Sequence, residues 1–275
     1  MNNKYFLQEY YTVSKYKNEN KNEDGLYLGE DFLAVIDGTT SKSEGTLNGK
    51  TGGQLARDII IEILQHLEGT EECNAVIEKI QDSIVRFAKE HNFPNMSASA
   101  VIYSCKKQEI WSVGDCQFSI NGVVEKNSKR VDEVFAETRS IAIHALLAQG
   151  YTEAELYEND VARQYLLPFL KIQEFLQNKT CKYGYCVFNG TCLPENFPIE
   201  NIKKVKVPEN AEIVLASDGY PQLFPTLSES EERLKKILAE DPFCYKIYRS
   251  TKGLVIGNNS FDDRTYLRFT ILNDI

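Results

Sequence analysis

The sequence has no excess of basic residues. Its 275 residues include 31 Lys and Arg against 40 Asp and Glu, which gives a formal net charge of -9. Proteins that bind nucleic acid need a basic surface to pair with the phosphates. The acidic balance therefore argues against DNA or RNA as a main partner.

Long apolar segments are lacking as well. No apolar run approaches the length of about 20 residues that a membrane-spanning helix needs, and the first residues do not form a signal-peptide pattern. The seven cysteines include no Cys-x-x-Cys pair, and with only three histidines they form no zinc-binding pattern. We therefore expect a cytoplasmic protein with reduced thiols and no membrane partner.

Internal repeats, low-complexity tracts and linkers are also missing from the sequence. A chain of 275 residues lies near the upper limit for a single hydrophobic core, and 42% hydrophobic residues are enough to build one. We therefore expect one domain over residues 1–275.

The sequence does contain acids at the ends of predicted strands. Five apolar residues, 32–36, lead directly into Asp37 and Gly38. This pattern predicts a strand that is buried on both faces and ends at Asp37. A carboxylate there is costly unless a cation or several donors hold it, although an Asp that only caps a turn is the alternative.

Four further acidic segments lie at the ends or starts of predicted strands. They contain Glu23 with Asp24, Asp115, Asp218, and Asp262 with Asp263. Their common position suggests one shared site. Magnesium and manganese take several carboxylate oxygens together with water, so the sequence predicts a site for one of these cations.

The order of these motifs resembles that of the metal-dependent Ser/Thr protein phosphatases of type 2C, in a divergent, bacterial-like form. The matching segments are Asn22-Glu23-Asp24, Asp37-Gly38, Gly52-Gly53, Gly114-Asp115, Ala216-Ser217-Asp218-Gly219 and Asp262-Asp263-Arg264-Thr265. The resemblance covers most of the chain except about 129–198. It implies an α+β fold: a four-layer α-β-β-α sandwich of two mostly antiparallel sheets flanked by helices.

The resemblance also implies the site. Two Mn²⁺ or Mg²⁺ ions would share Asp37, one of them also touching the Gly38 carbonyl. The second ion would be held by Glu23, Asp218 and Asp262, and Asp115 with Asp218 would form a third, weaker site. Asp24 would orient the attacking water, so that Asp37 and Asp24 carry the catalysis. The water, activated by the cations, would attack phosphorus in line.

Two functional residues of the family are missing. Glu19 stands roughly where the family has a phosphate-binding Arg, and Thr39 stands where many members have a general-acid His. Thr cannot act as a general acid near neutral pH. Lys17 or Lys21 could bind the phosphate as a point charge, but both are also typical of solvated loop lysines.

Cys116 stands where the family has Ser. A thiol beside a carboxylate is harder to ionise, so we do not expect a nucleophile at this position.

Other segments complete the predicted fold. We expect a first strand at 5–13, a helix that begins at Gly52 and a second helix around 76–87. A three-stranded meander within 97–126 follows, with a tight turn at Asn121-Gly122. Later come a hairpin made of 202–207 and the strand that ends at Asp218, and a helix at 229–238.

The segment 129–198 departs from the family and predicts a helical insert, or flap. We expect helices at 132–150, 152–167 and 169–178, with Pro168 breaking the last two, and a strand at 183–188. Such an insert is a candidate for substrate selection. Arg139, His144 and Arg163 could face the site, or they could be surface residues and local ion-pair partners.

The sequence thus predicts a metal-dependent phosphatase of phosphate monoesters, with phosphoserine and phosphothreonine proteins as substrates. A phosphatase of a small phosphorylated molecule is the first alternative. The second is a catalytically weak binding module on the same scaffold, which the missing Arg and His keep open.

Overall fold

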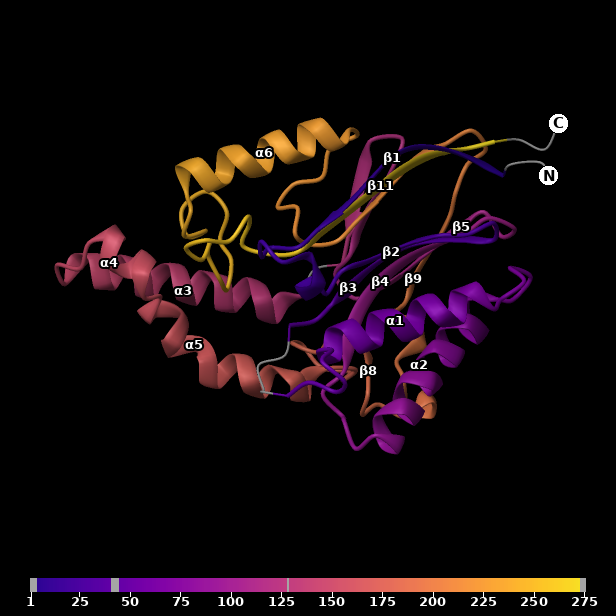
Figure 1. Ribbon diagram of the computed structural model, residues 1–275, viewed down its shortest axis with the longest axis horizontal. Helices are drawn as coiled ribbons and strands as arrows, with labels where there is room; N and C mark the ends of the chain where they lie inside the picture. The colour runs from indigo at the N-terminus through magenta and orange to yellow at the C-terminus, as the bar shows by residue number, and fades with distance from the viewer. Residues whose placement is uncertain (1–3, 41–44, 128, 273–275) are drawn as a thin grey trace.

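The computed structural model describes residues 4–40, 45–127 and 129–272. Within them, two antiparallel sheets stack face to face, and helices cover their outer faces (Figure 1). The first sheet has the order β1 (Tyr5–Val13), β11 (Arg264–Ile271), β10 (Glu212–Ala216), β6 (Gln117–Ile120), β7 (Val123–Lys126). The second has the order β2 (Gly25–Leu28), β3 (Phe32–Gly38), β4 (Ser97–Ser104), β5 (Glu109–Val113), β9 (Lys203–Lys206), and the short β8 (Phe188–Asn189) pairs with β4.

Helices form the two outer layers. Figure 1 shows α1 (Gly52–Gln65) and α2 (Cys73–Glu90) beneath the second sheet and α6 (Leu227–Glu240) above the first. The helices α3 (Arg130–Ala148), α4 (Glu153–Glu158) and α5 (Val161–Ile172) lie beyond one edge of the sandwich. The predicted α-β-β-α sandwich is therefore confirmed.

Strand β3 lies at the centre of this arrangement. Leu33 and Val35 pack between the two sheets, whereas Phe32, Ala34 and Ile36 pack toward α1 and α2. All five side chains are fully buried, so the strand is apolar on both faces as predicted. Burial of an aliphatic or aromatic side chain stabilises the fold by about 1.5–3 kcal/mol. The packing of these five side chains therefore holds Asp37, the next residue of the strand, in place.

The N-terminus of α1 packs directly against the end of β3. The Thr51 hydroxyl accepts a hydrogen bond from the Gln54 amide, and the Gln54 side chain accepts one from the Thr51 amide, which caps the helix. A Cβ on Gly38 would lie 2.6 Å from the Gly53 carbonyl oxygen, so this contact requires glycine. Gly38 is therefore needed for close backbone packing.

Two predicted strand pairings are wrong, because the chain changes sheets where they were expected. Strands β4 and β5 form a hairpin, but β6 pairs with β10 in the first sheet, so 97–126 is not a three-stranded meander. Gly114, with φ of +85°, lies where the chain crosses between the sheets. Strand β9 likewise pairs with β5, and β10 pairs with β6 and β11, so these two strands form no hairpin. The predicted turn at Asn121-Gly122 does join β6 and β7.

The helical insert also differs in detail from its prediction. Pro168 lies inside α5 and does not break it. The break comes earlier, at Asn159 and Asp160, because the Asp160 side chain caps a new helix by accepting from the Arg163 amide. Buried Leu166 and Leu170 lie on either side of Pro168 and pack on one face, which holds α5 together across the proline.

The strand predicted at 183–188 is reduced to β8. A side chain replaces a partner strand just before it: the Asn178 amide donates to the Val187 carbonyl at 2.9 Å and accepts from the Val187 N–H at 3.0 Å. These two hydrogen bonds satisfy the backbone without a regular ladder. Within the described residues, no helix has both the length and the apolar character needed to cross a membrane.

Candidate metal centre

Three of the predicted acids converge at one edge of the sandwich. Because β3 and β5 are both antiparallel to β4, their C-terminal ends meet at the same edge, and Asp218 follows β10 there in the other sheet. Carboxylate oxygens of Asp37, Asp115 and Asp218 lie within 4.8 Å of one another. All three line one cavity of about 510 Å³.

Asp37 and Asp218 both lie among other negative charges in this cluster. Burial raises the pKa of Asp37 well above its ordinary value, and the charges of Asp24 and Asp115 raise it further. Burial likewise raises the pKa of Asp218, followed by the charges of Asp37 and Asp115. Neither residue makes an ion pair with any residue that the structure describes. A divalent cation would relieve this repulsion.

Asp115 has partners of its own. The Lys129 Nζ lies 2.6 Å from Asp115 Oδ2, and the Ser99 hydroxyl donates to Asp115 Oδ1 at 2.5 Å. Burial raises the pKa of Asp115, but the charge and hydrogen bond of Lys129 outweigh it, and the pKa lies below its ordinary value. Lys129 also sits over the Tyr185 ring, with 5.0 Å between Nζ and the ring centroid. It immediately precedes α3, so it links the insert to the acids.

Glu23 and Asp262 lie beside this cluster and share a different partner, Lys15. The Lys15 Nζ is 3.2 Å from Asp262 Oδ1 and 3.6 Å from Glu23 Oε2. Lys252 pairs with the other oxygen of Asp262. The ligand set that the resemblance implies is therefore divided between an acid trio and a pair of acids that lysines already engage.

Asp24 is buried and has one carboxylate oxygen, Oδ2, without a hydrogen-bond partner among the described residues. Burial raises the pKa of Asp24 well above its ordinary value, and hydrogen bonds with Ser217 and Thr265 only partly offset this. A buried polar atom without a partner is rare in folded proteins. This oxygen is therefore suited to hold a water molecule.

Asp263 has a structural role that the sequence did not reveal. Its Oδ1 accepts from the Lys15 backbone N–H at 2.7 Å, and its Oδ2 accepts from the Glu23 backbone N–H at 3.1 Å. The carboxylate, which directly precedes β11, thus joins the start of that strand to the segment after β1 and to the segment before β2. The only feature of the sequence that pointed to Asp263 was its position directly after Asp262.

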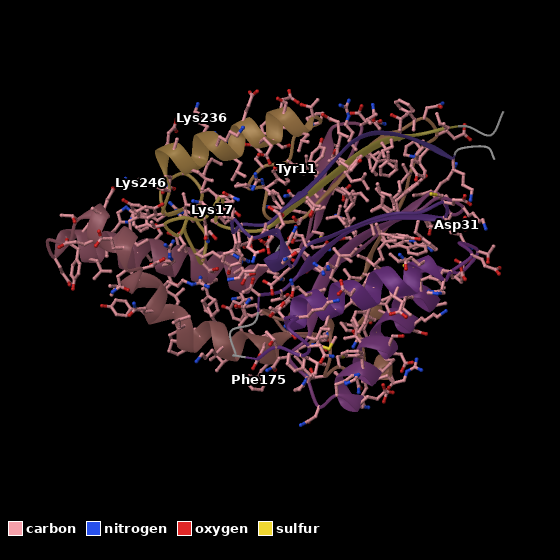
Figure 2. The ribbon with its side chains drawn as sticks, in the orientation of Figure 1. Tyr11, Lys17, Asp31, Phe175, Lys236 and Lys246 are labelled. Atoms are coloured by element: carbon pink, nitrogen blue, oxygen red, sulfur yellow. The ribbon has the colours of Figure 1, made fainter. Side chains whose placement is uncertain are left out.

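Lys17 and Lys21, which could bind phosphate or could be solvated loop lysines, do not line the cavity. Both are exposed; Figure 2 labels Lys17 in the loop that follows β1. Glu19, at the place of the family's Arg, accepts a hydrogen bond from the Ser14 amide at 2.9 Å. Thr39 does line the cavity. Lys15, Lys129 and Lys252 are the cations at the acids, and nothing in the sequence separates them from other lysines.

The polar residues singled out in the insert do not line the cavity. Arg139 is fully buried, pairs with Asp160 at 2.5 Å and donates to the Phe243 carbonyl at 2.7 Å. Arg163 donates to the Thr251 carbonyl, and the His144 ring packs edge-on against Tyr245. All three are local partners, and the two arginines hold the loop that carries Lys252.

Cys116 is buried behind the acids. Burial raises the pKa of its thiol well above the ordinary value, and the charges of Asp37 and Asp115 raise it further. A thiol in this environment stays protonated and is a poor nucleophile. This agrees with the sequence-based expectation.

Comparison with known proteins shows the fold. No protein-family model and no curated protein sequence matches the chain. Among solved structures, it is similar to the catalytic domain of the serine/threonine protein phosphatase PstP in complex with two manganese ions. That match has a TM-score of 0.51 and 15% identity, and it covers 98% of this chain and 100% of that one.

Two further solved structures agree. The Mycobacterium tuberculosis serine/threonine phosphatase PstP/Ppp matches with a TM-score of 0.50 and 15% identity, covering 98% of this chain and 100% of that one. A bacterial serine phosphatase matches with a TM-score of 0.51 and 14% identity, over 97% of this chain and 98% of that one. The chain therefore has the sandwich fold of bacterial type 2C phosphatases over nearly its whole length.

Proposed function

We propose that this protein is a metal-dependent phosphatase that hydrolyses phosphate monoesters, with phosphoserine and phosphothreonine proteins as substrates. The convergence of Asp37, Asp115 and Asp218 in a cavity of this fold carries the proposal. The donors are all carboxylate oxygens, which suit Mn²⁺ or Mg²⁺. Resemblance to the manganese-bound PstP domain supports the same reaction class.

The roles of the side chains follow from their positions. Asp37 and Asp218 would hold the cation, and Asp115 would complete its ligands in competition with Lys129. A bound divalent cation would make water more acidic and neutralise charge on the phosphate. Asp24, whose Oδ2 has no hydrogen-bond partner among the described residues and whose charge acts on Asp37, would orient that water or hold its proton. No covalent bond to the protein is required.

A binding module without strong activity is the second candidate, and a specific observation favours it. Lys15, Lys129 and Lys252 pair with three of the acids that the resemblance assigns to metals. Hydrolysis of a generic aryl phosphate, measured with and without Mn²⁺, separates the two candidates. A panel of phosphopeptides and small phosphorylated metabolites then distinguishes a protein phosphatase from a phosphatase of small molecules.

Removal of divalent cations should abolish hydrolysis. Excess chelator is expected to reduce aryl phosphate turnover to the level of an Asp218→Asn control. Without a bound cation, the carboxylates cannot make water acidic enough to attack the phosphate. Added Mn²⁺ or Mg²⁺ should restore aryl phosphate turnover by the wild-type protein but not by Asp218→Asn. Full activity in a large excess of chelator would rule out the metal-dependent mechanism.

The insert should influence the choice of substrate. Phe175 follows α5, is 71% exposed and lines the cavity; Figure 2 shows it at the lower end of this segment. Phe175→Ala should lower kcat/KM for some phosphopeptides by about tenfold, the effect of one lost apolar contact, with little change for aryl phosphate. Tyr165→Ala is the matched control, since Tyr165 is exposed on α5 outside the cavity. Equal losses on all substrates would contradict a role in selection.

A further inference from the structure

The Lys15 side chain is a buried cation among oxygen atoms. The residue is 5% exposed. Its Nζ lies 3.2 Å from Asp262 Oδ1, 3.4 Å from Asp263 Oδ2 and 3.6 Å from Glu23 Oε2. It also donates to the Thr40 hydroxyl at 2.8 Å. Oxygen ligands gathered around one positive charge are what a hard metal ion would also receive.

The position of this ammonium group is fixed by the backbone. Val13 pairs with Arg264, so the chain that continues past β1 runs beside Asp263 and Asp262. The Lys15 N–H donates to Asp263 Oδ1 at 2.7 Å, and its carbonyl accepts from the Asn259 N–H at 2.7 Å. The lysine is therefore held at both backbone groups, and its side chain has little freedom to leave.

Both carboxylate oxygens of Glu23 and of Asp262 have partners. The Thr51 hydroxyl donates to Glu23 Oε1 at 2.7 Å, and the Thr40 hydroxyl donates to Glu23 Oε2 at 2.5 Å. Lys252 pairs with Asp262 Oδ2. This contrasts with Asp37 and Asp218, which make no ion pair with any described residue.

Charge balance supports a permanent role for Lys15. Three carboxylates lie within 3.6 Å of the Lys15 ammonium group, and negative charges this close favour the charged form of the lysine. A divalent ion on the same oxygens would lie within a few ångströms of this ammonium group, and two cations that close repel strongly.

We infer that Lys15 is a resident cation of the acidic site: it takes the place of a divalent ion at Glu23 and Asp262, and confines metal binding to Asp37, Asp115 and Asp218. The inference rests on the proposed function only for the identity of the metal. It assigns to Glu23 and Asp262 the role of holding a lysine. The acidic site would then contain two kinds of cation, the ammonium group of Lys15 and a bound metal ion.

The number of bound Mn²⁺ ions tests this inference. It can be measured by titrating the full chain while free Mn²⁺ is followed by electron paramagnetic resonance. Lys15→Met should bind one more ion than the wild-type protein, because Glu23, Asp262 and Asp263 lose their shared cation. Lys252→Met is the matched control: it removes a lysine from the other oxygen of Asp262 but leaves Lys15 in place, so its ion count should equal that of wild type. An unchanged count in Lys15→Met, or an equal gain in Lys252→Met, would overturn the inference.

A second variant decides the question if Lys15→Met does not fold. Glu23→Gln keeps Lys15 and an oxygen acceptor for a threonine hydroxyl. If Lys15 is the resident cation, this variant should bind as many Mn²⁺ ions as wild type, with a dissociation constant changed by less than about threefold. Loss of one ion in Glu23→Gln would show that Glu23 is a metal ligand and would overturn the inference.

Hydrolysis measured on the same samples keeps the two proposals apart. A wild-type protein without Mn²⁺-dependent turnover would contradict the proposed function. The inference about Lys15 depends only on the ion counts, so it would stand if Lys15→Met gained an ion in that case.

Discussion

Asp37→Asn should abolish metal-dependent hydrolysis and leave the metal-free protein at least as stable as wild type. Activity is expected to fall because Asp37 belongs to the trio proposed to hold the cation. Stability is expected to hold or rise because the change removes one carboxylate from a partly buried acidic cluster in which neighbouring charges raise the pKa of Asp37. Melting curves with and without Mn²⁺, measured beside aryl phosphate turnover, test both effects.

The metal response of the variant should also be smaller. An ion that binds only the folded protein stabilises it by about 2.7 kcal/mol at a hundredfold excess over its dissociation constant. Asp37→Asn should lose most of this gain. Asp31→Asn serves as a control, because Asp31 pairs with Lys4 at a distant loop; Figure 2 shows it at the opposite end of the sandwich from the insert. A variant at position 37 that melts lower without metal and still hydrolyses phosphate would refute this assignment.

The advantage of Asp37→Asn in metal-free stability should depend on pH. The folded protein raises the pKa of Asp37, so ionisation above the unfolded value of about 3.9 works against folding. Below that pH both states bind the proton and the penalty vanishes. The stability difference between variant and wild type should therefore grow as pH rises from about 4 through the raised pKa.

Arg139→Met should destabilise the protein by about 3–5 kcal/mol, the cost of removing one partner from a buried ion pair. Arg139 is fully buried, pairs with Asp160 and donates to the carbonyls of Phe243 and Ser250. Denaturant unfolding measures the change. The matched control is Arg86→Met, which removes an exposed pair with Asp82 and should cost less than about 1 kcal/mol. An equal loss of unfolding free energy in both variants would show that the buried Arg139 pair stabilises the protein no more than an exposed pair does.

The sequence predicted the strands of the sandwich well because their signal is local. The alternation and apolar runs around β1, β3, β4 and β5 depend only on neighbouring residues. The positions of Asp37, Asp115 and Asp218 followed from the same signal, since each comes where an apolar run stops. The strand pairings were harder. Whether β6 joins β5 or β10 depends on contacts with residues almost a hundred positions away, which local patterns do not contain.

The lysines of the site could not be predicted for the same reason. Lys15, Lys17 and Lys21 look alike in the sequence, and only Lys15 is buried. What distinguishes it is the register between β1 and β11, which places it beside Asp262 and Asp263. The helix break before α5 was missed because the capping acid Asp160 gave a weaker signal than Pro168. In each case tertiary contacts decided the outcome.

The pairing of β1 with β11 has a consequence for how the chain folds. Tyr5 pairs with Ile271, so almost the whole chain separates the partners of this ladder. Contacts between residues so far apart in the sequence slow folding, because the chain loses the entropy of closing the loop before the contacts stabilise it. During synthesis, β1 can pair only after residues 264–271 have been made. The contact between Lys15 and Asp262 likewise forms only at that stage. The acidic site is therefore among the last parts of the protein to be assembled, and a nascent chain carries its carboxylates apart until that strand arrives.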